Sequence, residues 1–165
     1  MEINPESANP IRNVSDTALW VAVYRTMESE RKDALFHDPF ARRLAGERGQ
    51  AIVDAMPRGK ELAWAMIVRT AVMDELILQC IRDGATSVLN LAAGLDTRAY
   101  RLDLPESLHW YHVDFPPMVE YVKDKLTGEK PRCALEYVAA DLREPEQRDA
   151  IFRKAGGQIL LFRKL

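Results

Sequence analysis

After Gly84 the chain alternates short apolar runs with helix-forming segments, and this alternation limits the possible folds more than any other feature. The first run, Ser87 to Leu91, stops at Ala92-Ala93-Gly94, as a buried parallel strand does when it ends in a tight turn. Three later strands, with helices between them, are expected at His109 to Val113, Leu135 to Ala139 and Ile159 to Phe162. The order predicts a right-handed, mostly parallel α/β layer.

The residues before Gly84 show helical periodicity instead. Three helices are expected there, at Thr17 to Glu30, Asp38 to Leu44 and Lys60 to Arg82. In the second of them Asp38 is expected as the N-cap and Pro39 at the first helical position, with the helix ending near Gly46. Gly84 is well placed to end the long third helix. The boundary between a helical segment and an α/β segment therefore lies near Gly84.

Composition and charge argue against several classes of partner. Lys and Arg total 23 against 25 Asp and Glu, so no broad positive field is expected to attract nucleic acid or anionic lipid. No apolar run approaches the roughly 18 residues needed to span a bilayer, and the polar start does not resemble a secretory signal. Cys80 and Cys133 belong to no metal-binding or disulfide pattern. The sequence predicts a soluble, cytoplasmic protein without a structural metal.

Ligands of open α/β sheets bind at the carboxyl ends of the strands, and three such ends carry suggestive residues. Gly94 lacks a side chain where the chain turns, so its backbone can approach a ligand closely. Asp114, 20 residues later, can accept hydrogen bonds from both ribose hydroxyls of an adenosine ligand. Asp141 can accept one from the adenine amino group, and Leu142 can contact the ring. Each residue alone also fits a turn or a helix cap, but their spacing favours an adenosine site.

The histidines are poor catalytic candidates. His109 and His112 are three apart on a predicted strand, so their side chains are expected on opposite faces, where they cannot share a metal ion. His37 is expected to help cap or pack the turn at Asp38 and Pro39.

The segment Asn90 to Leu102, NLAAGLDTRAYRL, resembles the first motif of the leucine carboxyl methyltransferase-like family of S-adenosylmethionine-dependent enzymes. The similarity covers nearly the whole chain. It extends to Thr17-Ala18-Leu19, Phe36-His37-Asp38-Pro39-Phe40-Ala41, Val68-Arg69-Thr70, His112-Val113-Asp114-Phe115-Pro116 and Ala140-Asp141-Leu142-Arg143. The resemblance implies a Rossmann-like class I methyltransferase fold, with residues 1–83 as a helical lid and residues 84–165 as a partial core that binds S-adenosyl-L-methionine.

The same resemblance implies O-methylation, in which a carboxylate or hydroxyl oxygen of a small molecule or peptide attacks the donor's methyl group in line. Such a reaction depends mainly on positioning, with a base needed only when the acceptor carries a proton. Family correspondence places Arg69 against the carboxylate of the donor's methionine part, and Arg25 can join it. Arg98 can pair with Asp96 or face the ligand.

The sequence departs from the family pattern in two ways. Ala92 stands where the first motif usually has its first glycine. Class I methyltransferases also have seven-stranded sheets, whereas about four strands are expected here, so the sheet is predicted to be incomplete and the chain truncated, marginally stable and weakly active or inactive.

Two alternative functions fit part of the pattern. An NAD-dependent oxidoreductase would also use Asp114 for a ribose, but its G-x-G-x-x-G turn is absent because no glycine follows Gly94 before Gly128. A non-catalytic remnant would at most bind the methyl donor.

Overall fold

The computed structural model describes residues 14–56, 59–156 and 159–163. Six helices and four strands follow one another in these residues. Their bounds are α1 Val14–Ser29, α2 Ala41–Ala55, α3 Gly59–Arg82, β1 Ser87–Leu91, α4 Arg98–Arg101, β2 His109–Asp114, α5 Pro116–Lys125, β3 Ala134–Ala139, α6 Pro145–Ala155 and β4 Ile159–Arg163. The predicted fold class, an α/β Rossmann-like fold behind a helical segment, is confirmed.

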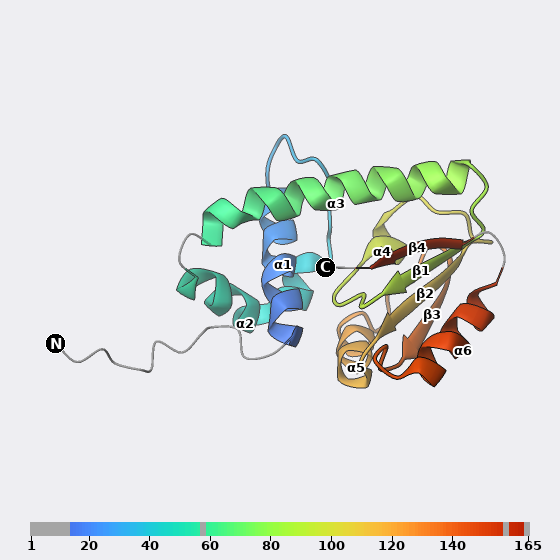
Figure 1. Cartoon of the computed structure of the whole chain (residues 1–165). Coiled ribbons are helices and arrows are strands. Elements are labelled where there is room, and N and C mark those ends of the chain that lie inside the picture. The colour runs from blue at the N-terminus through green and yellow to red at the C-terminus, as the bar shows by residue number, and fades with distance from the viewer. Residues whose placement is uncertain (1–13, 57–58, 157–158, 164–165) are drawn as a thin grey trace.

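The four strands form one parallel sheet in the order β3-β2-β1-β4 (Figure 1). This is the order of the first four strands of a doubly wound sheet. β1 lies between β2 and β4, and all five of its residues are buried, including the polar Ser87 and Asn90. All four strands point the same way, so the segments that follow β1, β2 and β3 meet at one edge of the sheet.

The two faces of the sheet bury different side chains because neighbouring residues of a strand point to opposite sides. Val88 of β1 and Trp110 of β2 pack in the larger core together with Val122 of α5. Leu89 and its same-face neighbours pack instead against Ile151 of α6. Helices therefore cover both faces, as the alternation of strands and helices requires.

The N-terminal helices lie largely beyond the carboxyl ends of the strands. Figure 1 shows α1 and α2 beside that end of the sheet, while α3 extends from these helices along the length of the strands. α3 begins and ends within one residue of its predicted bounds, and α1 begins three residues earlier than predicted. Gly84 has φ 103° and ends α3 as expected: its N–H bonds to the carbonyl of Ile81, and the next N–H reaches back to Cys80.

The prediction for α2 was wrong at both ends. The helix begins at Ala41, and Asp38 closes the turn before it, because its carboxylate accepts the N–H of Phe40 at 3.1 Å. Gly46, at φ 57° and ψ −173°, does interrupt the helix, but helical structure resumes and continues to Ala55. The continuation is stabilised by burial of residues such as Ile52 beneath α1 and α3.

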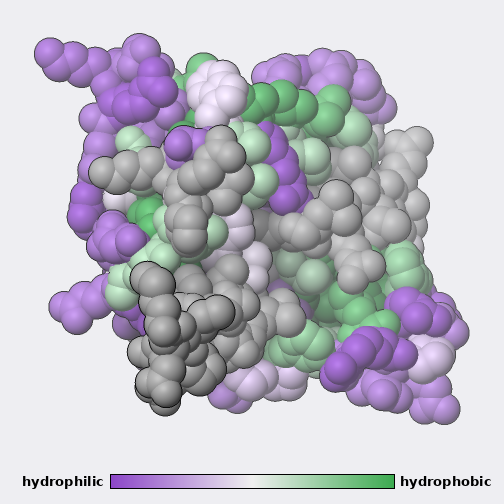
Figure 2. Space-filling view, turned by 60° about the vertical axis from the view of Figure 1, so that its left-hand side comes forward, coloured by the Kyte–Doolittle hydropathy of each residue, from purple (hydrophilic) through white to green (hydrophobic). Residues whose placement is uncertain are grey.

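Apolar side chains remain exposed on the outer side of α3. Trp64, Val72 and Leu76 each expose more than half of their surface. Apolar surface is visible along the top of the molecule, where α3 lies, between polar areas (Figure 2). Within the described residues, no helix has both the length and the apolar character needed to cross a membrane.

The thiol of Cys133, just before β3, predicts a pH dependence of stability. Burial raises its pKa from 9.0 to about 11, so the folded protein holds this proton at higher pH than the unfolded chain does. The stabilisation is complete below pH 9 and is lost as the pH rises towards 11. In urea titrations over this range, Cys133→Ala is expected to lose less stability than the wild type. Parallel losses in the two proteins would contradict the assignment.

Candidate functional site

The turn after β1 is shaped by two residues in the left-handed region. Gly94 has φ 55°, which glycine adopts without strain, and Ala92 has φ 51°, which is unfavourable for an L side chain. Between them, the N–H of Ala93 continues the sheet by bonding to the carbonyl of Val113 at 3.0 Å. The turn is therefore tied to β2 before it enters α4.

Asp114 and Gly94 are brought together by this arrangement. The N–H of Gly94 donates to Oδ2 of Asp114 at 2.6 Å, and the N–H of Phe115 donates to Oδ1 at 2.7 Å. Asp114 is half-buried at the end of β2. Its carboxylate therefore lies at the turn, as predicted, and each oxygen keeps a further lone pair for another donor.

Asp141 and Leu142 follow β3 at the neighbouring strand end. The N–H of Ala140 bonds to the carbonyl of Asp114 at 2.9 Å, so the two ends lie side by side. Asp141 is held by Arg143, whose Nε donates to it at 2.9 Å, and this hydrogen bond lowers the pKa of the carboxyl. Leu142 packs against the smaller core. Arg143 was not predicted as a site residue.

The Arg143 guanidinium also covers the ring of Phe115, with its Cζ 5.4 Å from the ring centroid. Phe115 is one of the larger exposed apolar side chains of the molecule. The ring lies directly after Asp114, so an aromatic surface, a cation and two carboxylates share this strand edge. Such a surface suits a flat heteroaromatic group next to a hydroxyl-bearing one.

His112 is a contact of the turn that the sequence did not reveal. It is 2% exposed, and its Nε2 lies 3.1 Å from the carbonyl oxygen of Gly94. The opposite-face prediction for the two histidines is consistent with the structure, because His109 is exposed while His112 is buried. The contact of His112 with the turn could have been predicted from its two-residue spacing from Asp114, which places both side chains on one face of β2.

Arg69 lies in a separate place from the Gly94 and Asp114 pair. It is half-buried on α3 and lines a small cavity together with Arg25, Thr70, Thr97 and Arg101. The structure thus places Arg69 beyond the turn, on its α3 side, while the acidic strand ends lie on the β2 side. The candidate site consists of two parts that are joined by the turn from Gly94 to Thr97.

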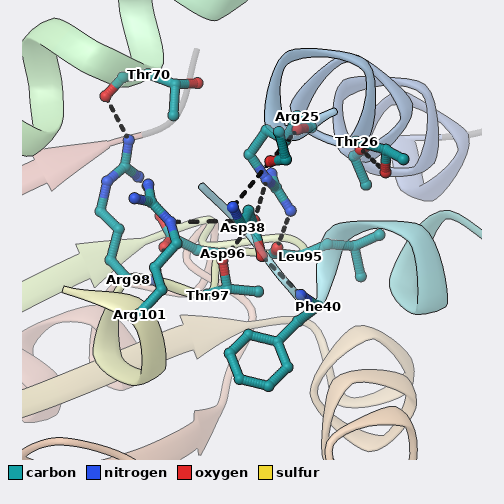
Figure 3. Close-up of polar contacts among 12 residues, drawn as sticks. Arg25, Thr26, Asp38, Phe40, Thr70, Leu95, Asp96, Thr97, Arg98 and Arg101 are labelled. Carbon is teal, nitrogen blue, oxygen red and sulfur yellow. Dashed lines mark hydrogen bonds and ion pairs between the residues drawn. The ribbon is translucent and has the colours of Figure 1, made fainter. Parts of the chain in front are cut away.

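A buried ionic network fixes the walls of the cavity (Figure 3). Arg25 of α1 donates to Asp38 at 2.8 Å and to the carbonyl of Leu95 at 2.6 Å, and Thr97 donates to the same Asp38 carboxylate at 2.7 Å. These contacts hold the helical segment on the turn after β1. Arg25 therefore has a structural role, because its guanidinium links α1 to Asp38 and to the turn after β1.

The network continues through α3 and α4. Arg98 donates to Asp74 at 2.6 Å and also pairs with Asp96, which is one of its two predicted roles. Burial acts to lower the pKa of the Arg98 guanidinium, but the Asp96 and Asp74 carboxylates outweigh it, so the pKa lies above its ordinary value. Arg101 pairs with Asp74 at 2.7 Å, and its own Nε has no hydrogen-bond acceptor among the described residues.

Among the described residues, no group of three or more metal-ligating side chains lies close enough together to hold a metal ion. The described side chains at the two parts of the site are carboxylates at the strand ends and guanidinium groups around the cavity.

Ala92 gives a direct test of the geometry of the turn. Its left-handed backbone costs about 1–2 kcal/mol for an L residue, whereas glycine loses about 0.4–1 kcal/mol through its freedom in the unfolded chain. Ala92→Gly is therefore expected to raise the free energy of unfolding by about 0.5–1 kcal/mol in urea titrations. Ala93→Gly, at a buried neighbour without left-handed geometry, should instead lower it. Destabilisation by both changes would contradict the conformation of Ala92.

Comparison with known proteins bears on the same residues. A family model described as leucine carboxyl methyltransferase matches residues 18–157. A protein of Streptomyces coelicolor is 37% identical in an alignment of 138 residues that covers 78% of this chain and 49% of the relative. A protein of Mycobacteroides abscessus is 32% identical in an alignment of 158 residues that covers 87% of this chain and 52% of the relative. Both are provisionally named S-adenosyl-L-methionine-dependent methyltransferases. The chain spans about half the length of the curated relatives it matches.

Proposed function

The chain belongs to the leucine carboxyl methyltransferase family, and from this premise we propose that it binds S-adenosyl-L-methionine at the strand ends and serves methyl transfer to an oxygen acceptor. The α/β part is proposed as the donor-binding core, and helices α1 to α3 as a lid over it. The observation that carries the proposal is the contact between Asp114 and the Gly94 N–H, because it brings an acid and a glycine turn to one strand edge.

The strand ends fit the adenosine part of the donor. Asp114 has unused lone pairs on both carboxylate oxygens and can accept the two ribose hydroxyls. Phe115 and Leu142 offer apolar contact to the adenine ring. Arg143 lowers the pKa of the Asp141 carboxyl, and this carboxylate can accept a hydrogen bond from the adenine amino group.

The arginine-lined cavity fits the methionine part. Arg69 is proposed to bind the donor carboxylate through its guanidinium, which suits bidentate recognition of a carboxylate. The guanidinium of Arg101 lines the same cavity, where it pairs with Asp74 at 2.7 Å and its Nε lies 4.0 Å from Asp38. Asp74 and Asp96 already pair with Arg98 and Arg101, so the side chains that line the cavity are fixed in place before the ligand binds.

The donor, when bound, supplies a methyl group on a positively charged sulfur, which an acceptor oxygen can attack. The contribution proposed for this chain is to orient the donor between Asp114 and Arg69 and to exclude water from it with the lid. We propose a carboxylate or hydroxyl of a small molecule or peptide as the acceptor. A carboxylate needs no base, because the attacking oxygen carries no proton.

Isothermal titration tests the proposal. S-adenosylhomocysteine is expected to bind the purified chain with one-to-one stoichiometry, and NAD is expected not to bind, because the turn lacks the glycines of a dinucleotide site. Binding of NAD without S-adenosylhomocysteine would favour the oxidoreductase and overturn the proposal. Transfer of a labelled methyl group to carboxylate or alcohol acceptors then tests turnover, and its absence despite binding would limit the chain to donor binding.

A further inference from the structure

The two peptide groups that flank the Cα of Gly94 are each held by a side chain of β2. The N–H of Gly94 donates to Oδ2 of Asp114 at 2.6 Å, and the carbonyl oxygen of the same residue lies 3.1 Å from Nε2 of His112. His112 and Asp114 are two residues apart on one strand, so both side chains point to the same face. This spacing lets a single strand hold both sides of a glycine that is otherwise free to rotate.

The geometry also fixes the proton on His112. A carbonyl oxygen can only accept a hydrogen bond, so Nε2 of His112 must carry the hydrogen and donate it to Gly94. The imidazole ring packs against the ring of Tyr137, with the centroids 5.0 Å apart, and the Tyr137 hydroxyl lies 2.9 Å from that of Tyr100. His112 therefore has a fixed ring orientation inside the core.

We propose that His112 is a positioning residue for the methyl donor, an inference that rests on the proposed function. By holding the Gly94 carbonyl, His112 fixes the peptide between Gly94 and Leu95, while Asp114 binds the N–H of the peptide before Gly94. Together the two contacts limit rotation about both backbone bonds of the Gly94 Cα. The carboxylate that is proposed to receive the ribose thus keeps one orientation before the donor arrives. Such preorganisation improves affinity because less order must be imposed on binding.

Two substitutions separate the hydrogen bond from the packing of the ring. His112→Phe keeps a ring against Tyr137 but removes the donor, and His112→Gln keeps an N–H donor but removes the ring. If His112 acts through Gly94, His112→Phe should bind S-adenosylhomocysteine about tenfold more weakly than the wild type, whereas His112→Gln should stay within about threefold. Binding that is equal in both variants, or weaker in His112→Gln, would overturn the proposal. His109→Gln, at an exposed position at the start of the same strand, is the matched control.

Hydrogen exchange without any ligand distinguishes this inference from the proposed function. In His112→Phe the Gly94 amide is expected to exchange about tenfold faster than in the wild type, while the amide of Leu89, inside β1, keeps its rate. Unchanged exchange at Gly94 would show that His112 does not hold the turn, and would overturn the proposal. If the wild type fails to bind S-adenosylhomocysteine, the proposed function fails, and the exchange rates still decide whether His112 fixes the turn.

Discussion

Replacing Arg98 with methionine is expected to lower the free energy of unfolding by about 3–5 kcal/mol, because the change removes a buried cation that two buried carboxylates share. Arg98 is buried and bridges Asp74 of α3 and Asp96 of the turn after β1. Asp74 keeps Arg101, but Asp96 loses its ion pair with Arg98. A loss of this size is a large share of the roughly 5–15 kcal/mol that stabilises a typical domain. Urea unfolding, followed by tryptophan fluorescence, measures it.

Arg82→Met is the matched control for this prediction. Arg82 lies on α3 and, like Arg98, pairs with an acid, Glu75, at 2.8 Å, but both of these side chains are more than half exposed. An exposed pair contributes about 0–1 kcal/mol, so this variant should unfold close to the wild type. Equal small losses in Arg82→Met and Arg98→Met would show that the network does not hold the turn to the helical segment.

Replacing Asp114 with alanine is expected to weaken the binding of S-adenosylhomocysteine at least hundredfold. The proposed ribose contacts are two hydrogen bonds to a charged acceptor, each contributing about 1.5–3 kcal/mol, and about 1.4 kcal/mol corresponds to a tenfold change in affinity. The substitution also removes the acceptor of the Gly94 N–H, so the turn loses part of its preformed geometry. Isothermal titration at constant salt and pH measures the affinity.

Asp149→Ala provides the comparison, since Asp149 is an exposed acid in the middle of α6. It should bind as the wild type does. Thermal unfolding of both variants shows whether the folded state survives. A folded Asp114→Ala variant that retains wild-type affinity would remove Asp114 from the site.

The sheet could be predicted closely from the sequence because its signals are local. Each strand is a short, mainly apolar run, the first three end near a glycine or an acid, and the observed bounds of all four agree with the predicted ones within one residue. The course of α2 could not be predicted in this way. Gly46 correctly indicates an interruption, but the helix resumes because Ile52 and its neighbours are buried against other helices. That burial depends on tertiary packing, which the local sequence does not contain.

In the candidate site, too, the residues placed by local sequence could be predicted, and the contacts made by tertiary packing could not. Gly94 and Asp114 were predicted to lie together from the rule for strand ends, and they do. The pairing of Arg143 with Asp141 and the contact of His112 with Gly94 depend on side-chain directions at neighbouring strand ends, which spacing alone does not fix. The ionic network joins residues up to 70 positions apart, such as Arg25 and Leu95, so no sequence motif could indicate it.

The roles of Arg69, Asp141 and Leu142 stay predictions that rest on family resemblance and on the geometry around them. These residues lie in two separate regions, so the proposed donor would have to contact both. The acids lie on the β2 side of the turn, and the arginine lies on the α3 side. A ligand that reaches both must therefore pass over the turn itself, where Ala92 and Gly94 determine how closely the backbone can approach it.

Chemical-shift mapping of the labelled protein during titration with S-adenosylhomocysteine tests the central claim most directly. If the strand ends form one adenosine site, the amides of Gly94, Asp114, Phe115, Asp141 and Leu142 should shift together, with one dissociation constant. Shifts confined to other parts of the chain, or no shifts at saturating ligand, would contradict the claim that these residues bind the donor.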